Sequence, residues 1–161
     1  MVHRTAGLAR PTPETIAFVE ERFGSDDPVV SQATAYTLGA LAPKATGDTK
    51  DRLMAKIGGM LTEDASAAAI QSALAGLGNA GMADTVDLIA SYVDHDDAPL
   101  RGQAATALRK IDTAQAHDLL IDMLDDTAAW VQRDVLSAMI YQGPSAPVSY
   151  THLTLPTNRE V

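Results

Sequence analysis

Residues 96–111 read DDAPLRGQAATALRKI, and residues 116–126 read AHDLLIDMLDD. In both stretches the apolar residues recur at intervals of three or four, which places them on one face of an α-helix. The first stripe consists of Leu100, Ala104, Ala107, Leu108 and Ile111, and the second of Ala116, Leu119, Leu120, Met123 and Leu124. Because each stripe has to be buried, this segment predicts a pair of helices packed on one core.

The helix pair recurs along the chain. Leu38 corresponds to Leu74, Leu108 and Met139, at separations of 36, 34 and 31 residues, and a second apolar anchor follows at Leu41, Leu77 and Ile111. Periods of this length are typical of units that bury their apolar faces by stacking. We therefore predict an all-α fold, a right-handed α-solenoid of stacked antiparallel helix pairs, over residues 1–146. The expected units are about 12–25, 26–62, 63–95, 96–125 and 126–143.

Acidic turns precede the first helix of several units. Asp26-Asp27-Pro28, Asp96-Asp97-Ala98-Pro99 and Asp125-Asp126-Thr127 offer carboxylates that can cap free helix N–H groups. Within residues 49–62, the adjacent Gly58 and Gly59 each cost about 1 kcal/mol relative to Ala inside a helix. A kink or an early helix end is expected there.

The two ends of the repeat array look incomplete. Residues 13–23 resemble a second helix whose first helix is missing or reduced to MVHRTAGLAR, and residues 126–140 resemble a first helix without its partner. Because solenoids normally close with polar terminal repeats, this pattern predicts an excerpt of a longer protein.

The last residues differ in composition from the rest. Residues 148–157 read VSYTHLTLPT, which resembles the translation of a transposase-type sequencing adapter. We expect residues 147–161 to be a non-native, disordered tail, and assign no role to Tyr150 or His152. Resequencing the locus from intact genomic DNA tests this interpretation.

Charge and composition narrow the partners. The 161-residue chain has 21 Asp and Glu against 12 Lys and Arg, a formal charge of −9, which repels nucleic acid and anionic membrane surfaces. It contains no Cys, no secretory signal and no long apolar run. We expect a soluble chain of unknown compartment, cytoplasmic by default, whose partner is a protein, with lipid as an alternative.

Residues 76–81 read GLGNAG and satisfy the dinucleotide-binding pattern G-x-G-x-x-G. That fold requires a strand before the glycines, whereas the preceding DASAAAIQSALA has a helical stripe. Asp84 also places a negative charge where a pyrophosphate would bind. We interpret the segment as a helix-ending turn, with Gly78 and Gly81 reversing the chain and Asn79 in a left-handed conformation.

Other polar residues suggest no complete chemical site. In the run Asp94-His95-Asp96-Asp97 the fifth position, where a calcium loop needs an oxygen ligand, is Ala98. His117 has no nucleophile or metal motif to complete a catalytic set. The sequence therefore predicts no catalytic, cofactor-binding or metal-binding residue, and no enzyme.

Three further side chains have two interpretations each. Arg101 and Arg133, in the first turns of first helices, can pair with turn aspartates of neighbouring repeats or bind an acidic partner. Trp130, the only Trp, is a core residue or an interface anchor.

The segment DDAPLRGQAATALRKI with AHDLLIDMLDD resembles HEAT-type repeats, and this resemblance covers residues 12–143. Residues 36–61 and 72–93 are also similar to the helical domain of the vitellogenin and lipovitellin family of large lipid-transfer proteins. Leu77-Gly78-Asn79-Ala80-Gly81 match that family's Ala-Leu-Gly-Asn-Ala-Gly turn, and Gly76 stands in place of its Ala.

These resemblances imply different functions. The first implies a non-catalytic scaffold that binds another protein, and the second a helical module of a lipid carrier. A third hypothesis, a HEAT protein with lyase-like activity such as the bilin lyase-like group, finds no catalytic residue in this chain.

Overall fold

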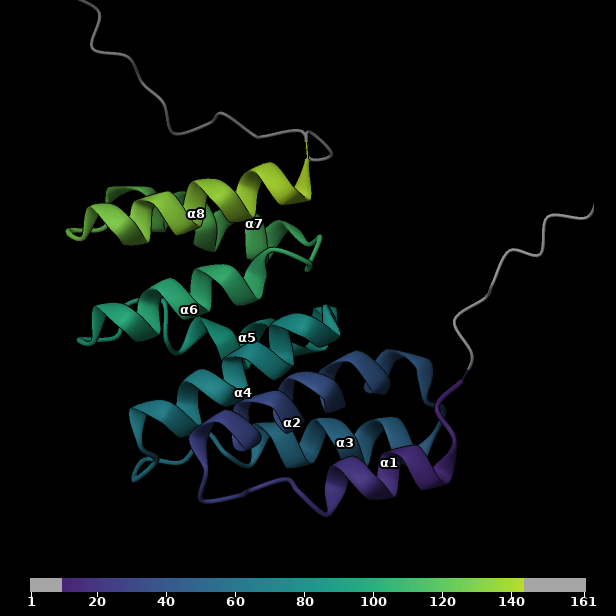
Figure 1. Cartoon of the computed structure of the whole chain (residues 1–161). Coiled ribbons are helices and arrows are strands. Elements are labelled where there is room, and N and C mark those ends of the chain that lie inside the picture. Colours follow the sequence, from purple (N-terminus) through teal and green to yellow (C-terminus); the bar gives the residue numbers. More distant parts are fainter. Residues whose placement is uncertain (1–9, 144–161) are drawn as a thin grey trace, which may run out of the picture.

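The computed structural model describes residues 10–143. Its described elements are all helical, which confirms the predicted fold class (Figure 1). The α-helices are α1 (Pro13–Glu20), α2 (Pro28–Leu41), α3 (Asp48–Gly58), α4 (Ala67–Ala80), α5 (Val86–Ala90), α6 (Ala98–Leu108), α7 (Ala114–Asp122) and α8 (Ala129–Gln142). Short 3-10 helices cover Ala42–Lys44, Ala83–Thr85 and Met123–Asp125. The predicted tail of residues 147–161 lies outside the described residues.

The helices stack in two rows. The helices α2, α4, α6 and α8 lie side by side in a first row, and α3, α5 and α7 form a second row against it (Figure 1). Helix α1 packs on α2, and its Glu20 forms ion pairs with Arg52 and Lys56 of α3. Consecutive helices run antiparallel, so the pairs α2–α3, α4–α5 and α6–α7 form a solenoid. The division of the chain into five units stays a prediction.

Most of the repeat anchors lie in the core, whereas Leu41 and Met139 are only partly buried against it. Leu38, Leu74 and Leu108 are fully buried, and each such side chain contributes about 1.5–3 kcal/mol to folding. The second row contributes the buried residues Leu53, Ile57, Val86, Ile89, Ala116 and Leu120. A helical stripe through Val30, Ala33, Leu38 and Leu41 predicts burial of Ala33, but this residue is exposed because α2 presents Ala35 and Gly39 to α4 instead.

The first row is close-packed at glycines. A Cβ atom on Gly39 would overlap the carbonyl oxygen of Gly76, and one on Gly76 would lie 2.7 Å from the carbonyl oxygen of Ala35. Between α4 and α6, a Cβ on Gly78 would lie 2.9 Å from the carbonyl oxygen of Ala107. These helices therefore meet backbone to backbone, an approach that only glycine permits.

The GLGNAG segment is mostly helix, so its predicted role as a turn is correct only at Gly81. That residue ends α4 in the left-handed conformation, with φ of 62°. Asn79 is helical; in the described chain the positive-φ residues are all glycines. Its amide instead joins α4 to α2 and to the turn that follows α6: Nδ2 donates to the carbonyl of Tyr36 at 2.8 Å, and Oδ1 accepts from Lys110 Nζ at 2.6 Å. The prediction failed because these contacts come from distant residues.

The predicted end of α3 is confirmed, and the predicted aspartate caps are confirmed at α2 but not at α6. Helix α3 ends at Gly58, as the adjacent glycines predict. Asp27 caps α2, its Oδ1 accepting from the N–H of Val29 at 2.8 Å. Asp97 makes no side-chain cap with α6, and its own N–H donates to His95 Nδ1 at 3.0 Å.

Gly39→Ala should lower the free energy of unfolding by about 1–3 kcal/mol, because the added methyl group meets backbone that no side-chain rotation can relieve. Gly58→Ala is the matched control: its methyl group would touch only Leu88 Cδ1, at 3.5 Å, and Ala gains up to about 1 kcal/mol inside a helix. Urea unfolding followed by circular dichroism measures both changes. A Gly39→Ala chain as stable as the parent would contradict the backbone contact.

Candidate functional site

Arg101 ties two successive inter-repeat turns together. From the first turn of α6, its Nε donates to Asp126 Oδ2 at 2.6 Å and its Nη2 to Asp126 Oδ1 at 3.0 Å. Its Nη1 donates to the carbonyls of His95 at 2.8 Å and Asp96 at 3.1 Å. Of the two interpretations of Arg101, the structure supports pairing with a turn aspartate of the next repeat.

The surroundings of this pair favour its charged form. Asp126 Oδ1 also accepts from the N–H of Ala128, at 2.7 Å. Hydrogen bonds from Arg101 hold the pKa of Asp126 below its usual value, and desolvation of the carboxylate only partly opposes this shift. The side chains of Arg101 and Asp126 are 14% and 6% exposed, so the pair is better shielded from solvent than a surface ion pair.

A shallow depression of about 350 Å³ surrounds this pair. Its other lining residues are Val93, Asp94, His95, Asp96, Asp122, Met123, Asp125 and Thr127. Arg101 is the one Lys or Arg among its lining residues, and its guanidinium already donates to a carboxylate and two carbonyls. In residues 10–143 no three His, Cys, Asp or Glu side chains are placed to hold one metal ion.

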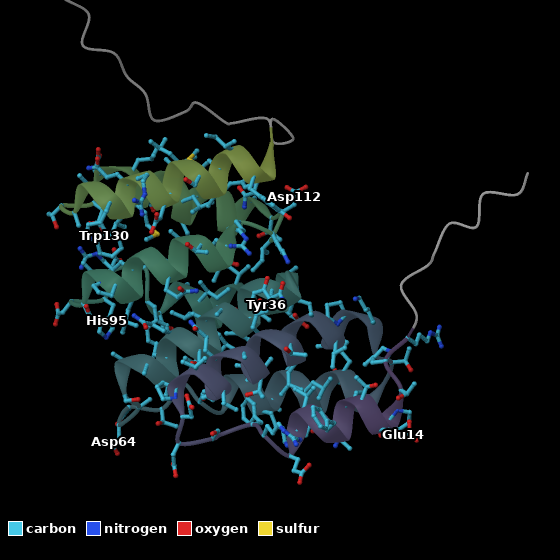
Figure 2. All side chains as sticks on the ribbon, in the orientation of Figure 1. Glu14, Tyr36, Asp64, His95, Asp112 and Trp130 are labelled. Carbon is cyan, nitrogen blue, oxygen red and sulfur yellow. The ribbon has the colours of Figure 1, made fainter. Side chains whose placement is uncertain are left out.

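The structure does not bring the two candidate histidines together. His95 lies at one edge of the helical array, and its ring is stacked on the ring of Tyr92, with the ring centroids 5.9 Å apart. His117 Nε2 lies 3.4 Å from Asp112 Oδ1, and Asp112 is at the opposite edge (Figure 2).

Arg133 and Trp130 of α8 make different contacts. Arg133 pairs with its neighbour Asp134 at 2.8 Å and is 71% exposed. The Trp130 ring lies against Gly102 of α6, where an added Cβ would come within 3.2 Å of Cη2, yet the residue is still 40% exposed. Trp130 therefore packs between first-row helices without being fully buried.

The second row presents a surface that the sequence analysis missed, which we call the α5–α7 face. It consists of Asp84, Asp87, Leu88, Gln115, Asp118, Ile121 and Asp122, all exposed. Gln115 Nε2 donates to Asp87 Oδ1 at 2.7 Å and so joins the two helices across this face. Neither residues 83–94 nor residues 114–125 contain a Lys or Arg. The lack of Lys and Arg, together with the acidic residues opposite each apolar stripe, is the sequence signal that could have identified the face.

Stacked antiparallel helix pairs with a recurring apolar register define a helical-repeat solenoid protein. Residues 54–140, more than half of the chain, match the family model described as HEAT repeats. The chain belongs to the HEAT-repeat family. No protein in the curated set matches it. Within residues 10–143, no helix is long and apolar enough to cross a membrane.

Arg101→Met should lower the free energy of unfolding by about 1–3 kcal/mol at neutral pH, because it leaves the shielded Asp126 carboxylate without its cation. Arg133→Met, which breaks an exposed pair between adjacent residues, should cost less than about 0.5 kcal/mol. Thermal and urea unfolding compare the two variants.

The pH dependence gives a second check on this pair. The folded pKa of Asp126 is lowered, so the contribution of the pair is complete above the unfolded aspartate pKa of about 4 and is lost as the pH falls through the folded value. The stability difference between the parent chain and Arg101→Met should therefore shrink below about pH 4. A difference that stays constant down to lower pH would argue against the carboxylate as the partner that matters.

Proposed function

We propose that this chain is a non-catalytic helical-repeat scaffold that binds a protein partner on the α5–α7 face. The observation that carries the proposal is the position of Leu88 and Ile121. Their sequence neighbours Ile89 and Leu120 are fully buried, whereas Leu88 is 43% exposed and Ile121 is 38% exposed. HEAT repeats commonly mediate protein interactions, and stacked repeats offer extended surfaces suited to this role.

The internal contacts of α5 and α7 support this choice of surface. Both helices use their inner sides, through Val86, Ile89, Ala116 and Leu120, to complete the core. On the outer side, Gln115 donates a hydrogen bond to Asp87, and Leu88 approaches Gly58. The outer side chains therefore contribute little to folding, and a partner can bind them without disturbing the core.

The polar side chains support a non-catalytic role. Arg101 is engaged by Asp126 and two carbonyls, and His95 accepts a hydrogen bond from the N–H of Asp97. His117 lies near Asp112. Each of these groups has a local partner that accounts for its position. We therefore propose that they stabilise turns.

A second candidate function is a helical module of a lipid carrier, favoured by the LGNAG segment at residues 77–81. In this structure Gly78 contacts Ala107, Asn79 bridges Tyr36 and Lys110, and Gly81 ends the helix. Packing accounts for these residues without a lipid, which is why we rank the carrier second.

Photo-crosslinking tests the scaffold proposal. A photoreactive amino acid at position 88 or 121 should capture the same protein in cells that express the chain, whereas the exposed position 33 on α2 should not. The captured protein, purified, should bind the purified chain, and Leu88→Ser with Ile121→Ser should weaken this binding about tenfold, because both apolar contacts are lost. Equal capture at position 33, or unchanged affinity of the double variant, would refute this binding surface.

Organic extraction of the purified chain, followed by mass spectrometry, separates the two candidates. The scaffold proposal expects no lipid in stoichiometric amount. One lipid per chain, retained through purification, would favour the carrier instead.

A further inference from the structure

We infer that the partner of the α5–α7 face is a basic, amphipathic protein segment, with Lys or Arg along its centre and apolar side chains at its flanks. This inference rests on the proposed function and adds the chemistry of the partner to it.

The charge of the face carries the first step. Asp84, Asp87, Asp118 and Asp122 are exposed, and no ion pair joins any of them to another residue of the described chain. The stretches 83–94 and 114–125 hold no Lys or Arg that could neutralise them. Four uncompensated carboxylates on two adjacent helices create a negative potential that attracts cationic side chains and repels anionic ones.

Helix α3, in the same row, is different. It carries Lys50, Arg52 and Lys56 beside Asp48 and Asp51, and two of these cations pair with Glu20 of α1. The uncompensated negative charge of the second row is therefore concentrated on α5 and α7, and does not follow from the acidity of the chain as a whole.

The arrangement of apolar and acidic residues sets the pattern of the partner. Leu88 lies on the α3 side of α5, where its Cδ1 approaches Gly58. Gln115 marks the side of α7 that faces α5, because it bonds Asp87. At 3.6 residues per turn, Asp122 and Asp118 follow Gln115 around α7, and Ile121 lies beyond them on the far flank. The carboxylates thus lie between two exposed apolar side chains.

This pattern selects among classes of partner. Nucleic acid, anionic membrane and acidic peptides are repelled by the carboxylates. A purely basic chain would leave Leu88 and Ile121 in water. A segment with a central basic row and flanking apolar side chains satisfies both parts of the face, in the way an amphipathic helix binds a groove.

Fluorescence anisotropy tests the inference on the full chain. The probes are a synthetic amphipathic peptide of Leu, Lys and Ala, its twin with every Lys replaced by Glu, and a scrambled peptide of the first composition. The basic amphipathic peptide should bind the chain, and its affinity should fall as salt is added. The acidic twin should not bind. The scrambled peptide should bind at least about fivefold more weakly, because its Lys and Leu side chains no longer lie together on one side of a helix.

Charge-reversal variants locate the binding. Asp118→Lys with Asp122→Lys should weaken binding of the basic peptide about tenfold or more. Asp26→Lys with Asp64→Lys changes the net charge equally on exposed turns outside this face, and should change the affinity less than about threefold. Circular dichroism confirms that both double variants fold.

The outcomes separate the inference from the proposed function. No binding of the basic peptide, equal binding of its acidic twin, or equal loss in both double variants would overturn the inference. The proposed function fails separately, when crosslinks at positions 88 and 121 capture no common protein. A partner captured at those positions whose affinity is unchanged by Asp118→Lys with Asp122→Lys would leave the scaffold standing and refute its basic chemistry.

Discussion

The first row depends on the contact between the backbones of α2 and α4. At Gly39 and Gly76 no side chain separates the two helices, and Gly78 brings α4 onto Ala107 of α6 in the same way. Because hard atoms meet at these points, the axes of the first-row helices have little freedom to shift. The second row then packs its apolar stripes onto a rigid layer, which is why short helices such as α5, from Val86 to Ala90, hold their place.

Polar contacts complement this packing at the two edges of the stack. Near the end of α4, Asn79 joins Tyr36 of α2 to Lys110 just after α6, and Arg101 joins the turns that precede α6 and α8. Asn79 makes two hydrogen bonds and Arg101 makes four, and in each case they run from one side chain to two different segments. Such contacts fix the position of one repeat relative to the next, whereas the apolar core alone tolerates sliding along its surface.

The sequence predicted the features that repeat and missed those that depend on distant neighbours. The anchors Leu38, Leu74 and Leu108 were found because burial imposes a period, and α3 ends at Gly58 as its local chemistry demands. The helical conformation of Asn79 was not predicted because its two partners, Tyr36 and Lys110, are distant in the sequence. For Arg101 both interpretations stayed open until the distance to Asp126 decided between them. The α5–α7 face was missed because the sequence of one helix does not show which of its polar residues will lie beside those of the next helix in the row.

The amide of Asn79 gives the stack a direction. Its donor faces the carbonyl of Tyr36 on one side, and its acceptor faces the ammonium group of Lys110 on the other. Because the amide can turn over about its Cβ–Cγ bond, these two partners select one of its two orientations, with the nitrogen towards α2 and the oxygen towards the segment after α6. The repeats are therefore not fully interchangeable: a rearranged gene that inserts a copy between α4 and α6 separates Asn79 from Lys110 and must supply a new donor for the amide oxygen.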